Sequence, residues 1–338
     1  MASRKQKFKH SGPTHITSTN WNYTQHRRSI AASLVQGVYV LEEDSQYNRK
    51  GQSALAPPWW SSFDFQLHPQ LLIDDSDSSI FGAIYKFESP APNTSCKYVV
   101  AFRGTVIKWR TIKQDIKLDL HHVFSQHKLQ NSSRVVKALK AVKTLVDDAG
   151  AANVWLAGHS LGSLVALLVG RNMVKMGFLV ETYLFNPPFS SLSIPMELLL
   201  VENMILKLGA RIIGDVFRAG LSVLGHQVSQ ADNPFIKLSG WTPYLFVNPK
   251  DPICSQYVPY FEQRKTMVSI GASTIGRMGT QVSVMSIVSS RARATEPHHL
   301  LPTAYLVTNL VKTKTKKSHK LAQWWSESFT GEIELQNF

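Results

Sequence analysis

The stretch Asn153-Val154-Trp155-Leu156-Ala157-Gly158-His159-Ser160-Leu161-Gly162-Ser163-Leu164-Val165 predicts a strand, a sharp turn and a helix in direct succession. Its first five residues form a short apolar run typical of a buried parallel strand, and residues 164–169 continue apolar at helical length. The turn between them has the spacing Gly-x-Ser-x-Gly. A strand that turns at once into a helix strains the serine and presses any side chain at the glycine positions against neighbouring backbone. Ser160 is then exposed at the carboxyl edge of the sheet, with the Leu161 amide directed at a developing oxyanion. The alternative is a glycine-rich turn with an unreactive serine.

Length and composition favour one globular α/β domain with insertions, because 338 residues with 43% hydrophobic and 18% charged residues can bury a single large core. We expect a polar basic tail over residues 1–20, a domain over 21–326 with a helical insertion at about 191–240, and a C-terminal tail over 327–338. The two cysteines, Cys96 and Cys254, are too few for a disulfide framework and lack metal-ligand spacing. A reducing compartment is therefore expected.

The formal net charge is +14, and basic residues gather at 4–9, at Arg27-Arg28 and at 312–320. Such a charge attracts anionic surfaces, either membrane headgroups or nucleic acid, although a solvated basic face is the simpler interpretation. No aromatic RNA-binding pattern, zinc spacing or basic recognition helix is present, so nucleic acid is not expected as a partner. The basic N-terminus lacks the apolar core of a secretory signal, which indicates a cytoplasmic protein, peripheral at membranes if it binds them.

Two further segments resemble parts of an acyl-transfer site. A strand at 98–102 runs directly into Arg103-Gly104-Thr105, where the amide or hydroxyl of Thr105 could supply a second oxyanion donor. A strand near 244–247 is followed by Asp251, at the carboxyl end of a late parallel strand where the acid of a Ser-His-Asp triad belongs. Aspartate next to proline is also a common turn residue.

Histidines later in the chain are candidates for the base, because the chain order Ser, Asp, His is the one that this type of sheet uses. His298 and His299 lie in a loop bounded by Pro297 and Pro302, whereas His319 lies in the basic segment. The pair is therefore the better placed.

Two amphipathic regions lie between these motifs. Residues 106–120 carry apolar side chains at spacings of three and four, interspersed with basic ones, and predict a lid, a membrane-contacting helix or an ordinary surface helix. Residues 194–225 are apolar but carry a charge every three to five residues, so they predict a pair of amphipathic helices over the site rather than a transmembrane span.

Together these motifs resemble a class 3 (fungal-type) lipase domain. The resemblance rests on Phe102-Arg103-Gly104-Thr105, Gly158-His159-Ser160-Leu161-Gly162, the turn at 248–252 and His299-Leu300-Leu301-Pro302. Pro58-Trp59-Trp60, Leu184-Phe185-Asn186-Pro187-Pro188 and Gln323-Trp324-Trp325 are similar to a plant branch of that family, often labelled GDSL esterase/lipase although Gly-Asp-Ser-Leu does not occur here.

The resemblance implies an α/β-hydrolase fold, a mostly parallel sheet with helices on both faces and a helical cap. It implies Ser160 as nucleophile, Asp251 as acid, His299 as base with His298 as the alternative, and Thr105 and Leu161 as the oxyanion hole. The expected activity is hydrolysis of acyl or lipid esters through an acyl-enzyme, with no cofactor or metal. The rival hypothesis is a catalytically silent lipase-like scaffold or regulatory interaction protein.

Overall fold

The structure is a computed structural model that describes residues 20–55, 59–88, 96–105, 132–189, 237–269, 301–312 and 314–337. The predicted N-terminal tail, the basic segment at 106–120 and almost all of the predicted helical insertion at 191–240 lie outside these residues, as do His298 and His299. The helices and strands described for this chain lie within these ranges.

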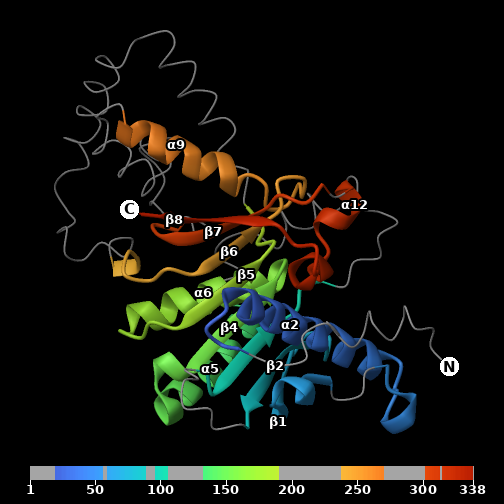
Figure 1. The fold of residues 1–338 in the computed structure, drawn as a ribbon. Coiled ribbons are helices and arrows are strands. Elements are labelled where there is room, and N and C mark those ends of the chain that lie inside the picture. The colour runs from blue at the N-terminus through green and yellow to red at the C-terminus, as the bar shows by residue number, and fades with distance from the viewer. Residues whose placement is uncertain are drawn as a thin grey trace.

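An eight-stranded mixed sheet forms the centre of the molecule, with its strands side by side in chain order (Figure 1). The outer pairs β1–β2, β2–β3 and β7–β8 are antiparallel, whereas β3 to β7 run parallel. The strands are β1 (Phe65–Ile73), β2 (Ile80–Phe87), β3 (Tyr98–Phe102), β4 (Val154–His159), β5 (Glu181–Phe185), β6 (Tyr244–Val247), β7 (Ala304–Asn309) and β8 (Gly331–Gln336). The parallel centre matches the prediction from short apolar runs.

Helices cover both faces of the sheet, as the sequence predicted. The α-helices are α2 (Thr24–Gln46), α5 (Ser133–Ala149), α6 (Leu161–Lys175), α9 (Tyr257–Ser269) and α12 (Thr315–Ser318), and short 3-10 segments include η3 (Ala151–Asn153) and η5 (Leu321–Trp325). Helix α2 packs on one face with η5, while α5 and α6 pack on the other (Figure 1).

Alternation along the central strands divides the core into two layers. Val99 and Ala101 of β3 join the cluster beneath α2, and Val100 and Phe102 join the cluster beneath α5 and α6. This follows from the two-residue period of a strand, whose successive side chains point to opposite faces. A parallel strand buried on both faces is therefore apolar throughout, which is why residues 98–102 could be recognised from sequence.

Local signals set the ends of helix α5. The Ser132 hydroxyl accepts a hydrogen bond from the Val135 amide at 3.4 Å, and Gly150 ends the helix with φ of 85°. A serine N-cap and a terminating glycine with positive φ are the expected boundaries of a helix. The crossover through α5 then returns the chain to β4, which runs parallel to β3.

The C-terminal end differs from the sequence prediction. Residues 331–336, assigned there to a tail, form strand β8, which pairs antiparallel with β7 over six residue pairs from Ala304–Gln336 to Asn309–Gly331. Most of β8 is exposed, so it has no buried apolar face that would mark it in the sequence. No helix among the described residues is long and apolar enough to cross a membrane.

Candidate active site

Ser160 lies at the turn between β4 and α6 and has backbone angles that residues other than glycine seldom adopt. Its φ is 55° and its ψ is −126°, and only 6% of the residue is exposed. Strain of this kind persists only where the surrounding structure enforces it. The backbone thus has the strand, strained serine and helix that the Gly-x-Ser-x-Gly spacing predicts.

The two glycines of this motif are needed for the steric reason that the Gly-x-Ser-x-Gly spacing predicts. A Cβ on Gly158 would lie 2.3 Å from the Gly162 carbonyl oxygen, and a Cβ on Gly162 would lie 2.3 Å from the Phe102 carbonyl oxygen. Both neighbours are backbone atoms, so neither can rotate away. The tight packing brings the start of α6 against the end of β3.

The loop after β3 contacts the serine directly. A Cβ on Gly104 would lie 2.8 Å from the Ser160 Cβ and 2.9 Å from the His159 carbonyl oxygen. Thr105 follows Gly104 and is exposed. The chain therefore brings the predicted oxyanion loop and the start of α6, with Leu161, to the same place as Ser160.

Asp251 follows β6 and is completely buried. Its Oδ2 accepts hydrogen bonds from Asn186 Nδ2 at 2.7 Å and from the Cys254 thiol at 3.2 Å, and its Oδ1 accepts one from the Ile253 amide at 3.1 Å. Burial alone would raise the pKa of this carboxyl, but the hydrogen bond and charge of His319, with the Ile253 and Cys254 donors, lower it below its usual value. The site therefore holds Asp251 as a carboxylate.

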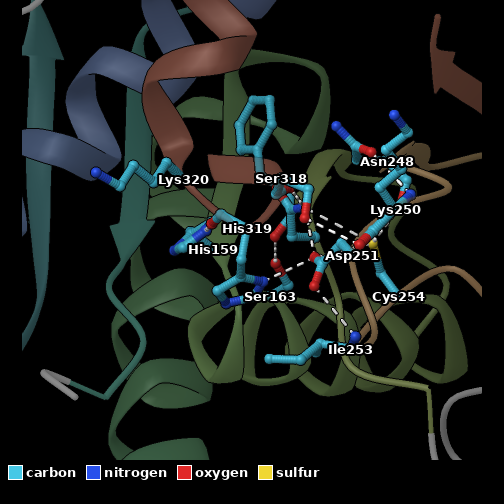
Figure 2. Close-up of polar contacts among 12 residues, drawn as sticks. His159, Ser163, Asn248, Lys250, Asp251, Ile253, Cys254, Ser318, His319 and Lys320 are labelled. Atoms are coloured by element: carbon cyan, nitrogen blue, oxygen red, sulfur yellow. Dashed lines mark hydrogen bonds and ion pairs between the residues drawn. The ribbon is translucent and has the colours of Figure 1, made fainter. Parts of the chain in front are cut away.

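His319 is the histidine that pairs with this carboxylate. Its Nδ1 lies 2.7 Å from Asp251 Oδ2, and its side chain is 12% exposed (Figure 2). Its backbone carbonyl oxygen lies 2.9 Å from Nε2 of His159, the residue before Ser160. His319 thus lies beside both the acid and the serine turn, a position that sequence reasoning did not give it.

Topology explains this position. Ser160 and Asp251 follow the carboxyl ends of β4 and β6, and parallel strands present these ends at one edge of the sheet. His319 follows the carboxyl end of β7, whereas Leu301, close behind the predicted pair, precedes its amino end. His298 and His299 lie outside the described residues, so their assignment stays a prediction. Recognising residues 304–309 as the last parallel strand would have drawn attention to His319.

Asn186 joins the acid to the segment that carries His319. Besides Asp251, its Nδ2 donates to the Ser318 carbonyl oxygen at 3.0 Å, and its Oδ1 accepts from Trp324 Nε1 at 2.6 Å. Asn186 is buried and has a positive φ of 47°. The sequence marked this residue only as part of a family motif. In the structure its amide fixes the position of the acid relative to residues 318–324.

Within the described residues, no group of three or more His, Cys, Asp or Glu side chains is arranged to hold a metal ion. Two surface cavities of about 290 and 240 Å³ lie between α9 and β7–β8 and between α2 and β5–β8, and neither is lined by Ser160, Asp251 or His319.

Comparison with known proteins identifies a relative along the whole chain. A protein named GDSL esterase/lipase from Arabidopsis thaliana is 40% identical over 358 aligned positions, which cover 100% of this chain and 99% of that protein. No protein-family model matches, so the class 3 resemblance stays a prediction. No solved structure matches either. On the full-length identity, the chain belongs to the same family as this Arabidopsis GDSL esterase/lipase.

Proposed function

We propose that this chain is a serine carboxylic ester hydrolase of the α/β-hydrolase type, with Ser160 as nucleophile, Asp251 as acid and His319 as base. The observation that carries the proposal is the 2.7 Å contact between His319 Nδ1 and the buried Asp251 carboxylate, beside a serine held at a strained turn. The name of the Arabidopsis relative agrees with this class of reaction. The proposed substrate is an acyl ester, including acyl lipids.

The reaction has two acyl-transfer steps. His319 donates from Nδ1 to Asp251, which leaves the Nε2 lone pair to accept the Ser160 proton as the hydroxyl oxygen attacks the ester carbonyl. The tetrahedral oxyanion would accept hydrogen bonds from Thr105 and from the Leu161 amide. Collapse breaks the ester bond, and the imidazolium returns the proton to the departing alcohol. Water then adds to the acyl-enzyme by the same route and releases the carboxylic acid.

A fluorophosphonate probe tests this function, because it labels only an activated serine. We expect labelling at Ser160 and hydrolysis of a short p-nitrophenyl ester, both abolished in Ser160→Ala. A wild-type protein that neither reacts with the probe nor hydrolyses esters of graded chain length would instead support the silent-scaffold hypothesis.

The choice of base has its own test. His319→Ala should lower the rate of ester hydrolysis by several orders of magnitude, as removal of a triad member does elsewhere. His298→Ala and His299→Ala should retain most of the activity. If His319→Ala stays active and His298→Ala or His299→Ala loses activity, the base is one of that histidine pair and the assignment of His319 is wrong.

We also propose that the protein contacts anionic membrane surfaces from the cytoplasmic side. Five exposed lysines lie next to the proposed acid and base in the chain, and none forms an ion pair with another described residue: Lys250, Lys312, Lys314, Lys317 and Lys320. Lys320 points away from Asp251 in Figure 2. Each lysine near an anionic bilayer contributes about 1 kcal/mol, so such a group supports peripheral binding.

Vesicle flotation tests this contact. The wild type should bind vesicles that contain phosphatidylserine and not pure phosphatidylcholine, and Lys314→Glu with Lys317→Glu should weaken binding. Lys140→Glu is the matched control, because Lys140 is exposed on α5, at the opposite end of the molecule from α12 (Figure 1). Equal binding to both vesicle types would refute the proposal.

A further inference from the structure

A chain of hydrogen bonds links the loop after β3 to the segment that carries His319. The Tyr39 hydroxyl on helix α2 accepts from the Gly104 amide at 2.8 Å and lies 2.8 Å from Nδ1 of His159. Nε2 of His159 in turn lies 2.9 Å from the His319 carbonyl oxygen. Four parts of the chain far apart in sequence are thus joined through the side chains of Tyr39 and His159.

The partners at each end fix the directions of the two outer hydrogen bonds. The Gly104 amide can only donate to the Tyr39 oxygen, so the Tyr39 proton is available for His159 Nδ1. The His319 carbonyl can only accept, so His159 must carry its proton on Nε2. A His159 that accepts from Tyr39 at Nδ1 and donates from Nε2 is a neutral imidazole in a single tautomer.

The surroundings of His159 agree with this neutral state. Burial, together with the nearby charge of His319, lowers the pKa of His159 to about 3. The two imidazole rings are tilted at 42° to each other, with their centroids 4.9 Å apart. A neutral His159 therefore places no second charge beside the proposed base.

We propose that Tyr39 and His159 are positioning residues that hold the oxyanion loop and the backbone of the base in fixed relation to Ser160. The inference rests on the proposed function, and neither residue contacts the reacting atoms in it. Tyr39 fixes the Gly104 peptide, which sets the position of the neighbouring Thr105. His159 fixes the His319 carbonyl, which limits movement of the base relative to the serine that follows His159.

Tyr39→Phe removes the central hydroxyl while retaining the ring. It leaves the Gly104 amide and His159 Nδ1 without their partner, so kcat for a p-nitrophenyl ester should fall about tenfold to a hundredfold with little change in KM. Tyr85→Phe is the matched control, because Tyr85 is also buried but its hydroxyl has no hydrogen-bond partner among the described residues. The control should leave kcat unchanged.

A double-mutant cycle distinguishes positioning from general destabilisation. If Tyr39 acts through the oxyanion loop, Tyr39→Phe should reduce kcat much less in a Thr105→Gly background than in the wild type. A purely structural loss would have the same effect in both backgrounds. Equal factors in the two backgrounds would overturn the role of Tyr39.

Variants of His159 give a second test that does not depend on the stability of Tyr39→Phe. Glutamine carries one acceptor and one donor, whereas leucine carries neither, so His159→Gln should retain at least tenfold more activity than His159→Leu. Equal activity of the two variants would overturn the role of His159.

Fluorophosphonate labelling separates this inference from the proposed function. A wild type whose Ser160 does not react would refute the proposed function. A reactive wild type, with Tyr39→Phe labelled as fast as Tyr85→Phe, would refute the inference alone. Slower labelling of Tyr39→Phe than of the control would support both.

Discussion

Replacing Gly162 with alanine sets two physical effects against each other. Gly162 is the second residue of α6, and alanine is favoured over glycine within a helix by about 1 kcal/mol. Helix propensity alone therefore predicts a more stable protein. The close packing of this turn against β3 predicts the opposite.

The structure gives the size of the opposing effect. The added Cβ would lie 2.3 Å from the Phe102 carbonyl oxygen, 2.6 Å from the Arg103 carbonyl oxygen and 2.7 Å from the Arg103 carbonyl carbon. A close carbon–oxygen contact is about 3.3 Å, so the backbone must separate by about 1 Å. Overpacking of this kind costs about 1–3 kcal/mol. Since no flexible side chain can yield, we expect the upper end, which leaves a net loss of about 2 kcal/mol.

Catalysis should be more sensitive than stability. Arg103 leads directly into Gly104 and Thr105, so a shift of about 1 Å at Arg103 displaces the proposed oxyanion donor. A misplacement of this size can lower the rate about a hundredfold. Gly162→Ala should therefore show a moderate loss of stability and a large loss of kcat.

Urea denaturation followed by tryptophan fluorescence measures the stability, and ester hydrolysis measures kcat. Gly240→Ala is the control, because no atom of the described residues lies within 4 Å of a Cβ added at Gly240. This substitution should change the free energy of unfolding by less than about 0.5 kcal/mol. If Gly162→Ala is as stable as the wild type and fully active, the packing argument for this turn is wrong.

Three further predictions concern the buried polar groups. Asn186→Ala should lower the free energy of unfolding by about 3 kcal/mol, because Trp324 Nε1 and the buried Asp251 carboxylate lose a hydrogen-bond partner. Urea denaturation measures this loss, and a loss below about 1 kcal/mol would contradict the role of Asn186. Glu42→Ala should lower the free energy of unfolding by about 3–5 kcal/mol in the same measurement, because buried Arg103 loses the carboxylate that lies 3.5 Å away. An unchanged free energy of unfolding would show that this ion pair contributes nothing to stability. The lowered pKa of His159, about 3, means that below pH 6.5 the unfolded chain binds a proton that the folded chain does not. This residue should therefore reduce stability as pH falls, by at most about 1.4 kcal/mol per pH unit between pH 6.5 and 3, and His159→Gln should show a smaller slope in denaturation series. Equal slopes would refute the buried neutral imidazole.

Local sequence patterns were sufficient for much of the fold. Apolar residues at helical spacing, Ile30, Leu34, Val35, Val38 and Leu41, mark helix α2, and a run of five apolar residues marks β3. Both signals depend on neighbours in the chain, since helical and extended backbones place side chains on faces with fixed periods. The same applies to the turn at Ser160, where the glycine spacing reflects contacts within a few residues and with one adjacent strand.

The partner of Asp251 could not be obtained in this way. His319 reaches the carboxylate because β7 lies between the predicted histidine pair and residue 319 in the chain. The strand carries the chain to the edge of the sheet where Asp251 lies. Its basic surroundings, from Lys312 to Lys320, suggested a solvated surface segment instead. No local pattern reports which end of a strand a distant residue will join.

The sequence by itself determined the parallel centre of the sheet and the strained serine turn, because both are encoded in short-range patterns of apolar residues and glycines. Only the tertiary structure decided that His319 faces Asp251, that Asn186 joins the acid to residues 318–324, and that residues 331–336 pair with β7. These contacts connect segments up to 138 residues apart, as Asn186 and Trp324 show. The physical reason is that such pairings depend on the order and direction of strands, which follow from burial of the whole core rather than from any one segment.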